Sequence, residues 1–226
     1  MNLNENLIKA AKEGNTEKVK SLLARGADIH AEDDHALHLA AQKGHTETVK
    51  LLLDRGADIH AETDGPDAAM RLAAEDGHTD TVRLLLDRGA DVHARGWWDS
   101  ALSVAAGNGH TEIVKLLLAR GAKANAENGE ALERAVENGH RDIVELLIEQ
   151  KADIHGGKDK ALKAAAHNEQ KEIAGILLSH YNRKELKELE QNPELKEIRP
   201  DIEKELKIRL VKSVMKHQQE NPGMDM

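Results

Sequence analysis

Residues 44–61, GHTETVKLLLDRGADIHA, decide how this chain folds, because related copies of the stretch recur along most of its length. The stretch opens with a Gly-His turn, and Thr46 then offers an N-cap hydroxyl to a helix that carries Val49 and the following leucines on one side. It closes at Arg55-Gly56, where glycine can adopt the left-handed conformation that ends a helix. The stretch therefore predicts a short amphipathic helix between two turns.

The copies of this turn are regularly spaced, which indicates a repeat protein. The aligned turn residues, at intervals of 30, 33, 32, 30 and 30, are Gly14, Gly44, Gly77, Gly109, Gly139 and Glu169. Small apolar residues precede each turn, as in residues 36–41, and predict a first helix. Two short helices cannot bury an apolar face alone, whereas stacked pairs share a continuous one. We expect an all-α solenoid of about six helix-turn-helix repeats.

The repeated stretch resembles the ankyrin repeat, and the resemblance covers about residues 4–182. It implies units of two antiparallel helices, joined by loops, or fingers, that project from the stack. The Thr-Pro-Leu-His segment of the family survives only in forms such as Ala36-Leu37-His38, and three of the five fingers are about three residues shorter than usual. This is similar to the 30-residue variety of some viral and bacterial ankyrin proteins. We assign residues 1–182 to an ankyrin repeat domain.

The sixth copy departs most from the pattern, as terminal repeats tend to do. Lys151 stands where a helix-ending glycine is expected. Gly175 lies inside the last second helix, where glycine is about 1 kcal/mol less favourable than alanine.

Beyond residue 182 the repeat is lost, and residues 183–226 are predicted to form a helical C-terminal extension. Asn192-Pro193 and Arg199-Pro200 each favour a helix start with proline in the first turn. A helix from Pro200 to about Gln219 would align Ile202, Leu206, Leu210 and Val214. We expect these helices to cap the open end of the solenoid. A helix presented to a partner, or an oligomer seam, is the alternative.

The composition excludes several classes of function. The chain has 226 residues, no cysteine and a formal charge of −9. Without cysteine there is no disulfide, thiol nucleophile or thiolate metal site, and the acidic charge argues against a nucleic-acid partner. No apolar run reaches the roughly 18 residues of a membrane span, and the N-terminus lacks a secretory signal. We expect a cytoplasmic monomer or, if the source is a pathogen or symbiont, delivery to a host cell by a non-Sec route.

No catalytic, metal or cofactor site is predicted. The 13 histidines mostly recur in register, and equivalent positions in stacked repeats lie about 10 Å apart, too far for two imidazoles to share a zinc ion. Asp33, Asp34, His35 and His38 cluster in the first finger, but a finger tip is open to water and does not perturb pKa values as catalysis requires. The chain has neither a Gly-x-Ser-x-Gly turn nor a glycine-rich phosphate loop. We therefore predict that the protein is not an enzyme.

Both tryptophans stand in one finger, within ARGWWDS at residues 94–100. A core of alanine, leucine and valine has no evident slot for two adjacent indoles, and tryptophan is enriched among residues that dominate interface energies. We expect Trp97 and Trp98 to anchor a partner, with Arg95 and Asp99 as a polar rim. The alternative is that one ring folds back over Met70 or the neighbouring finger.

The resemblance implies that the fingers and the ends of the first helices line a concave groove. The remaining predicted contact residues come from these segments and are Asp33, Asp34, His35, Gln42, Lys43, Asp64, Asp67, Arg71, Glu75, Asp76 and Asn108. They make the groove of the first three repeats mainly acidic, whereas Lys158, Lys160 and Lys163 make its C-terminal end basic. We expect a protein partner with a basic segment.

The resemblance implies a non-enzymatic protein-interaction module, such as an adaptor, a scaffold or an effector. The alternative is an inhibitor or immunity protein whose tryptophan finger plugs the active site of an enzyme. An engineered binder is a third interpretation, which the unequal fingers disfavour.

Overall fold

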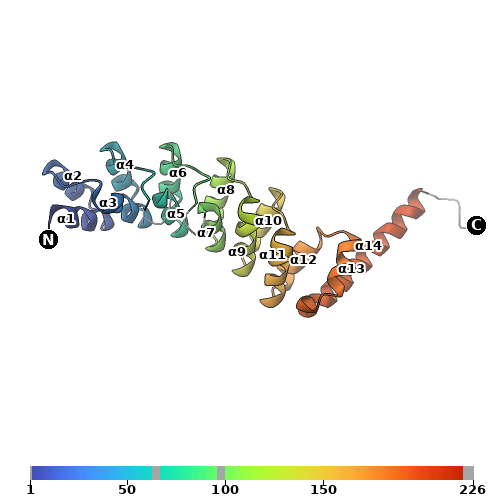
Figure 1. Cartoon of the computed structure of the whole chain (residues 1–226). Helices are drawn as coiled ribbons and strands as arrows, with labels where there is room; N and C mark the ends of the chain where they lie inside the picture. The colour runs from blue at the N-terminus through green and yellow to red at the C-terminus, as the bar shows by residue number, and fades with distance from the viewer. Residues whose placement is uncertain (1, 63–66, 96–99, 221–226) are drawn as a thin grey trace, which may run out of the picture.

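The structure, a computed structural model, describes residues 2–62, 67–95 and 100–220 and forms a row of helix-turn-helix pairs without strands in those residues (Figure 1). The pairs are α1 (Leu3–Lys12) with α2 (Thr16–Ala24), α3 (Ala31–Gln42) with α4 (Thr46–Asp54), α5 (Ala68–Glu75) with α6 (Thr79–Asp87), α7 (Ala101–Gly107) with α8 (Thr111–Ala119), α9 (Glu130–Glu137) with α10 (Arg141–Glu149), and α11 (Gly156–His167) with α12 (Lys171–Leu178). The predicted all-α solenoid of about six repeats is confirmed.

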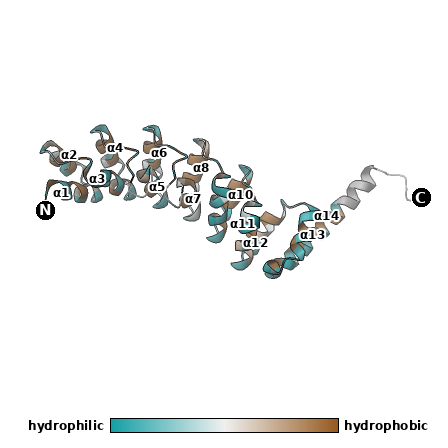
Figure 2. Cartoon of the chain, viewed as in Figure 1, coloured by the Kyte–Doolittle hydropathy of each residue, from teal (hydrophilic) through white to brown (hydrophobic). Residues whose placement is uncertain are grey.

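Two layers of helices build the stack. Each first helix contacts the next first helix, from α1 to α11, and each second helix contacts the next second helix, from α2 to α12. Most helices carry both hydrophilic and hydrophobic residues (Figure 2), as expected for helices with one buried face. The first helices bury small residues such as Ala40 and Ala41, which let neighbouring helices approach closely, and the second helices bury residues such as Val49 and Leu52. The result is one continuous core rather than a separate core for each pair.

The turn histidines tie each pair to the pair before it. His110 Nε2 lies 2.9 Å from the carbonyl oxygen of Glu75, and His140 Nε2 lies 2.9 Å from that of Gly107. The ring also lies over the turn glycine of the preceding pair, since a Cβ at Gly77 would be 2.6 Å from His110 Cε1. The Gly-His turn is therefore a structural joint between neighbouring pairs.

The N-cap role predicted for the turn threonines is wrong. The N-cap residues of α4, α6 and α8 are histidines without a side-chain cap hydrogen bond. Thr46 is the first residue inside its helix, so its hydroxyl points sideways and lies 2.8 Å from Thr81 Oγ1 of the next pair. Thr16 and Thr48 repeat this contact at 2.8 Å. The hydroxyls thus join pairs rather than begin helices.

The short fingers end in a left-handed turn that leads into the next first helix. Glu32, Asp33 and Asp34 all have φ between 55° and 59°. The same run of three positive φ values occurs at residues 127–129 and 157–159. A left-handed residue with a side chain is less stable by about 1–2 kcal/mol, so contacts elsewhere in the finger must hold these turns.

The C-terminal extension continues the stack. It consists of α13 (Arg183–Glu190), the 3-10 helix η2 (Pro193–Ile198) and α14 (Arg199–Glu220), with η2 packed on α11 and α14 packed on α12. Leu186, Leu195, Ile198 and Ile202 are buried in the same core as the repeats. The predicted capping role is confirmed. The far end of α14 projects beyond the stack (Figure 1).

Candidate protein-binding surface

Buried carboxylates hold the bases of two fingers. Asp34 is 3% exposed, and its carboxylate accepts a hydrogen bond of 2.9 Å from the backbone N–H of Asp58, in the next finger. The same carboxylate lies 3.1 Å from His30 Nδ1. Asp67, which is 2% exposed, accepts a bond from the backbone N–H of Asp91 and lies 2.9 Å from His60 Nδ1.

These contacts correct the expectation that Asp34 lies in a water-exposed loop. Its carboxylate faces the backbone of the next repeat. The separate side-chain hydrogen bond between Asp34 and His30 raises the pKa of His30. Burial raises the pKa of Asp67 as well. Asp33 remains exposed and His35 is half-buried, so the first finger offers only these two of its predicted residues to a partner. Asp34 and Asp67 instead position the fingers.

The ends of the first helices form links between repeats. Lys43 Nζ lies 3.7 Å from Asp76 Oδ2, across two neighbouring pairs. Asn108 Nδ2 donates to the carbonyl oxygen of Glu75, and the Glu75 carboxylate lies 3.6 Å from Arg71. Lys43, Asp76 and Asn108 are exposed, whereas Gln42, Arg71 and Glu75 are half-buried. The structure thus brings the predicted groove residues of the second, third and fourth repeats into one surface.

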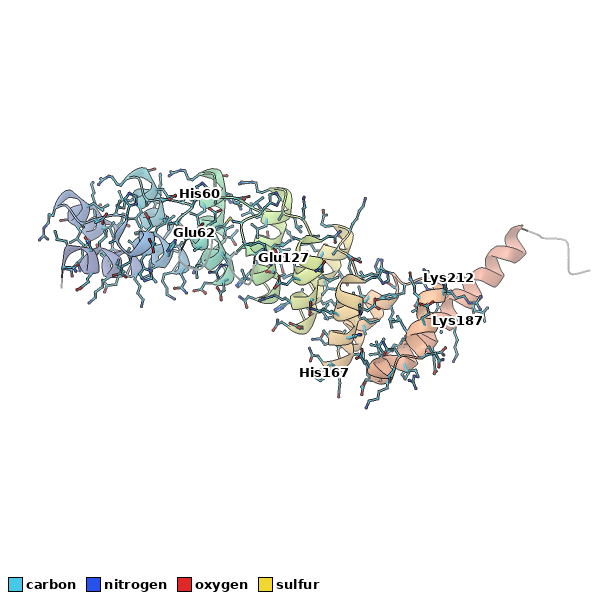
Figure 3. The ribbon with its side chains drawn as sticks, viewed as in Figure 1. His60, Glu62, Glu127, His167, Lys187 and Lys212 are labelled. Atoms are coloured by element: carbon cyan, nitrogen blue, oxygen red, sulfur yellow. The ribbon has the colours of Figure 1, made fainter. Side chains whose placement is uncertain are left out.

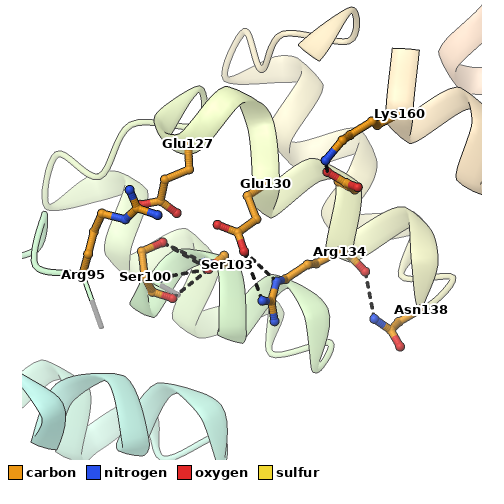
Figure 4. A network of polar contacts seen from close by, with 9 residues as sticks. Arg95, Ser100, Ser103, Glu127, Glu130, Arg134, Asn138 and Lys160 are labelled. Carbon is orange, nitrogen blue, oxygen red and sulfur yellow. Dashed lines mark hydrogen bonds and ion pairs between the residues drawn. The ribbon is translucent and has the colours of Figure 1, made fainter. Parts of the chain in front are cut away.

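The tryptophan finger, residues 95–100, is closed at its base. Arg95 and Ser100 form an isolated antiparallel bridge, and Ser100 caps α7 together with buried Ser103 (Figure 4). Arg95 Nε lies 2.7 Å from Glu127 Oε1, in the following finger. Four predicted contact residues fall outside the described residues and stay predictions: Asp64, Trp97, Trp98 and Asp99.

A second link leads from this finger into α9. Glu127, whose position in its finger is marked in Figure 3, faces Glu130, and Arg134 Nε donates to Glu130 Oε1 at 3.1 Å. Burial, followed by the hydrogen bond with Glu127, raises the pKa of Glu130 to about 7. Two ion pairs thus meet through their carboxyl groups beside the tryptophan finger, Arg95 with Glu127 and Arg134 with Glu130 (Figure 4).

Three of these four residues, all but Arg95, line an open groove of about 500 Å³, called the acidic groove below. Its lining residues are Glu127, Glu130, Glu133, Arg134, Glu137 and Lys160. The sequence predicted two of them in the groove, Glu137 at the end of a first helix and Lys160 at the basic end, but not the other four. The signal was present in α9, where Glu130, Glu133 and Glu137 follow one another at the i, i+3 and i+7 spacing that places side chains on one helix face.

The predicted basic end of the groove is partly neutralised. Lys160 Nζ lies 3.3 Å from Glu133 Oε2, and Lys163 Nζ lies 2.6 Å from Glu194 Oε2. Glu194 belongs to η2, so the C-terminal cap supplies this negative partner. The acidic character of the groove therefore extends further along the solenoid than the sequence suggested.

Within the described ranges, no group of three or more His, Asp or Glu side chains is arranged to hold a metal ion. No helix in that part of the chain is long and apolar enough to cross a bilayer.

The fold and its surface define the class of protein, a helical repeat solenoid with fingers projecting between its pairs. A family model described as ankyrin repeats (3 copies) matches residues 7–96 and 72–158, which together make up more than half of the chain. The chain belongs to the ankyrin-repeat family, whose repeats are generally protein–protein interaction modules. A search of curated proteins finds no match.

Proposed function

We propose that the protein is a non-enzymatic adaptor, scaffold or effector that binds a partner protein across the tryptophan finger and the acidic groove. The observation that carries this proposal is their adjacency: Arg95, at the base of the finger, is paired with Glu127, which lines the groove. A partner that covers both would contact aromatic and charged surface together, which is the composition typical of interface centres and rims.

The chemistry of the partner follows from the two parts. A segment rich in lysine or arginine would complement the carboxylates of the acidic groove. An apolar side chain next to that segment would contact Trp97 and Trp98, whose indoles can each contribute 2 kcal/mol or more to an interface. Arg71 and Asn108 supply polar contacts on the N-terminal side of the finger.

We infer that the protein works as a cytoplasmic monomer. The absence of cysteine suits a reducing compartment, and a formal charge of −9 favours solubility without self-association.

The test begins with affinity capture by the full chain from the source cells, followed by calorimetric titration of the purified partner. Trp97→Ala combined with Trp98→Ala should weaken binding at least tenfold, about 1.4 kcal/mol, because both anchors are removed. Lys50→Ala combined with Arg83→Ala, on the exposed surfaces of α4 and α6, is the control and should leave affinity unchanged. Equal affinities for wild type and the double tryptophan variant would refute the proposal.

A further inference from the structure

The projecting half of α14 exposes apolar side chains that the rest of the described chain keeps covered. Ile208, Leu210 and Val211 are 37%, 46% and 56% exposed, and they are the exposed large hydrophobic side chains among the residues the structure describes. Single exposed apolar residues are ordinary on a protein surface, but here three lie within four positions.

Among the described side chains of α14, those that pack on the stack come just before the exposed ones. Ile202 is fully buried and Leu206 packs against the core. Among the side chains that the structure describes, Arg209 is the last one anchored, because its guanidinium donates to the carbonyl oxygen of Ser179 at the end of α12. The helix nevertheless continues to Glu220, about 16 Å further at 1.5 Å per residue. The described side chains that close the core thus come before this second half.

The sequence around these exposed side chains carries one sign of charge. Residues 207–216, KIRLVKSVMK, contain four Lys or Arg and no Asp or Glu. The rest of the chain then has a formal charge of −13, since the whole chain has −9. Ile208 and Val211 lie three positions apart, and so share a helix face, with Lys207 and Lys212 next to them in the sequence. A basic amphipathic helix thus extends from an acidic body.

The charge of α14 and of the rest of the chain indicates which kind of partner can cover the apolar face of α14. A second copy of α14 would bring like charges together, and an anionic bilayer or a nucleic acid would repel the acidic body. Carboxylates around an apolar groove, in contrast, would pair with Lys207 and Lys212 while the groove receives Ile208 and Val211. Helices of this kind are bound by acidic proteins with such grooves.

We propose that residues 207–212 of α14 form a second interaction surface, which docks as a helix into an apolar, carboxylate-rimmed groove of another protein. This surface lies on the C-terminal cap and does not depend on the tryptophan finger. The protein would then hold two partners, one at each site.

Calcium-loaded calmodulin is the probe, because it is an acidic protein that opens a Met-rich apolar groove on binding calcium. Isothermal titration with the full chain should give a saturable complex in calcium and none in EGTA. Ile208→Ser combined with Val211→Ser keeps the charge and should lower affinity at least tenfold. Lys207→Glu combined with Lys212→Glu should do the same. The matched control is Lys184→Glu combined with Lys187→Glu, which makes the same charge change on α13 (Figure 3) and should bind like wild type.

Three outcomes would overturn the proposal. The first is that calmodulin gives no complex, or a complex that the serine pair leaves unchanged. The second is that the full chain binds phosphatidylserine vesicles, or dimerises in sedimentation runs, and loses that property in the serine pair. The third is that Trp97→Ala with Trp98→Ala abolishes calmodulin binding, which would place the contact at the finger. Far-UV melting curves check that every variant remains folded.

Discussion

At the scale of single residues, Gly77 and Gly89 have similar backbone conformations but differ in the space available to a side chain. Both are left-handed, with φ of +84° and +98°. A Cβ at Gly77 would lie 2.6 Å from the His110 ring, whereas a Cβ at Gly89 would have nothing within 4 Å. Gly77 is therefore required both by its own turn and by the neighbouring repeat, and Gly89 only by its own turn.

Gly77→Ala should accordingly destabilise the protein more than Gly89→Ala. Both variants carry the left-handed penalty of about 1–2 kcal/mol, and Gly77→Ala adds about 1–3 kcal/mol because the His110 ring must move. Urea unfolding of the two variants measures the difference directly. Equal losses of stability in the two variants would show that the His110 ring accommodates the added Cβ at no cost.

Glu130 predicts a dependence of stability on pH. Its pKa of about 7 in the fold exceeds the ordinary value of 4.5, so between these values the folded protein binds more protons than the unfolded chain. The stabilisation is complete below the lower value and is lost as pH rises to the higher one. The free energy of unfolding of wild type, relative to Glu130→Gln, should therefore fall between about pH 5 and pH 7 and then level off. Denaturant titrations at several pH values test this, and parallel pH profiles would contradict it.

At the scale of the elements, the sequence predicted helices well because each depends on nearby residues. The spacing of Val49 and Leu52, and the glycine that follows Arg55, are enough to indicate the length and the buried side of α4. The same local reasoning placed Lys151 at a helix end, where it has a φ of +63°.

The finger turns could not be predicted in this way. Glu32 is neither glycine nor asparagine, so nothing local favours its left-handed conformation. The turn is held by Asp34, whose partner in the next finger, Asp58, is 24 residues away. The contact between Arg95 and Glu127 was missed for the same reason, because it depends on the paths of two fingers and not on local spacing.

Gly175 offers a test within a single element. It lies inside α12, and a Cβ there would contact nothing within 4 Å. Gly175→Ala should stabilise the protein by about 1 kcal/mol, because alanine loses less backbone entropy in a helix. For a chain of this size the melting temperature should rise by about 2–4 °C. A lower melting temperature would mean that the helix needs the glycine.

At the scale of the whole molecule, the C-terminal cap belongs to the same core as the repeats. Removing residues 183–226 would uncover the sixth pair and lose the burial of residues such as Leu186, Ile198 and Ile202. Each such side chain contributes about 1.5–3 kcal/mol before chain entropy is set against it. The shortened protein should melt at a clearly lower temperature, as followed by circular dichroism.

A shorter truncation provides the control for this experiment. Removing residues 213–226 leaves in place all the cap residues that are buried among the side chains the structure describes. Its melting temperature should match that of the full chain. A loss equal to that of the longer truncation would mean that the end of α14 takes part in capping.

The hydrogen bond that the turn residue makes to the preceding repeat also affects the order in which the repeats unfold. Gln170 stands where the other turns have histidine, and its amide lies 3.4 Å from the carbonyl oxygen of Glu137, compared with 2.9 Å for His140 and Gly107. In a linear array each unit is secured only by its immediate neighbours, so disruption spreads from the least secure boundary. Unravelling should then start with the sixth unit and its cap, while the first five remain intact for longer. Hydrogen exchange would register this as a gradient of protection that declines toward the C-terminus.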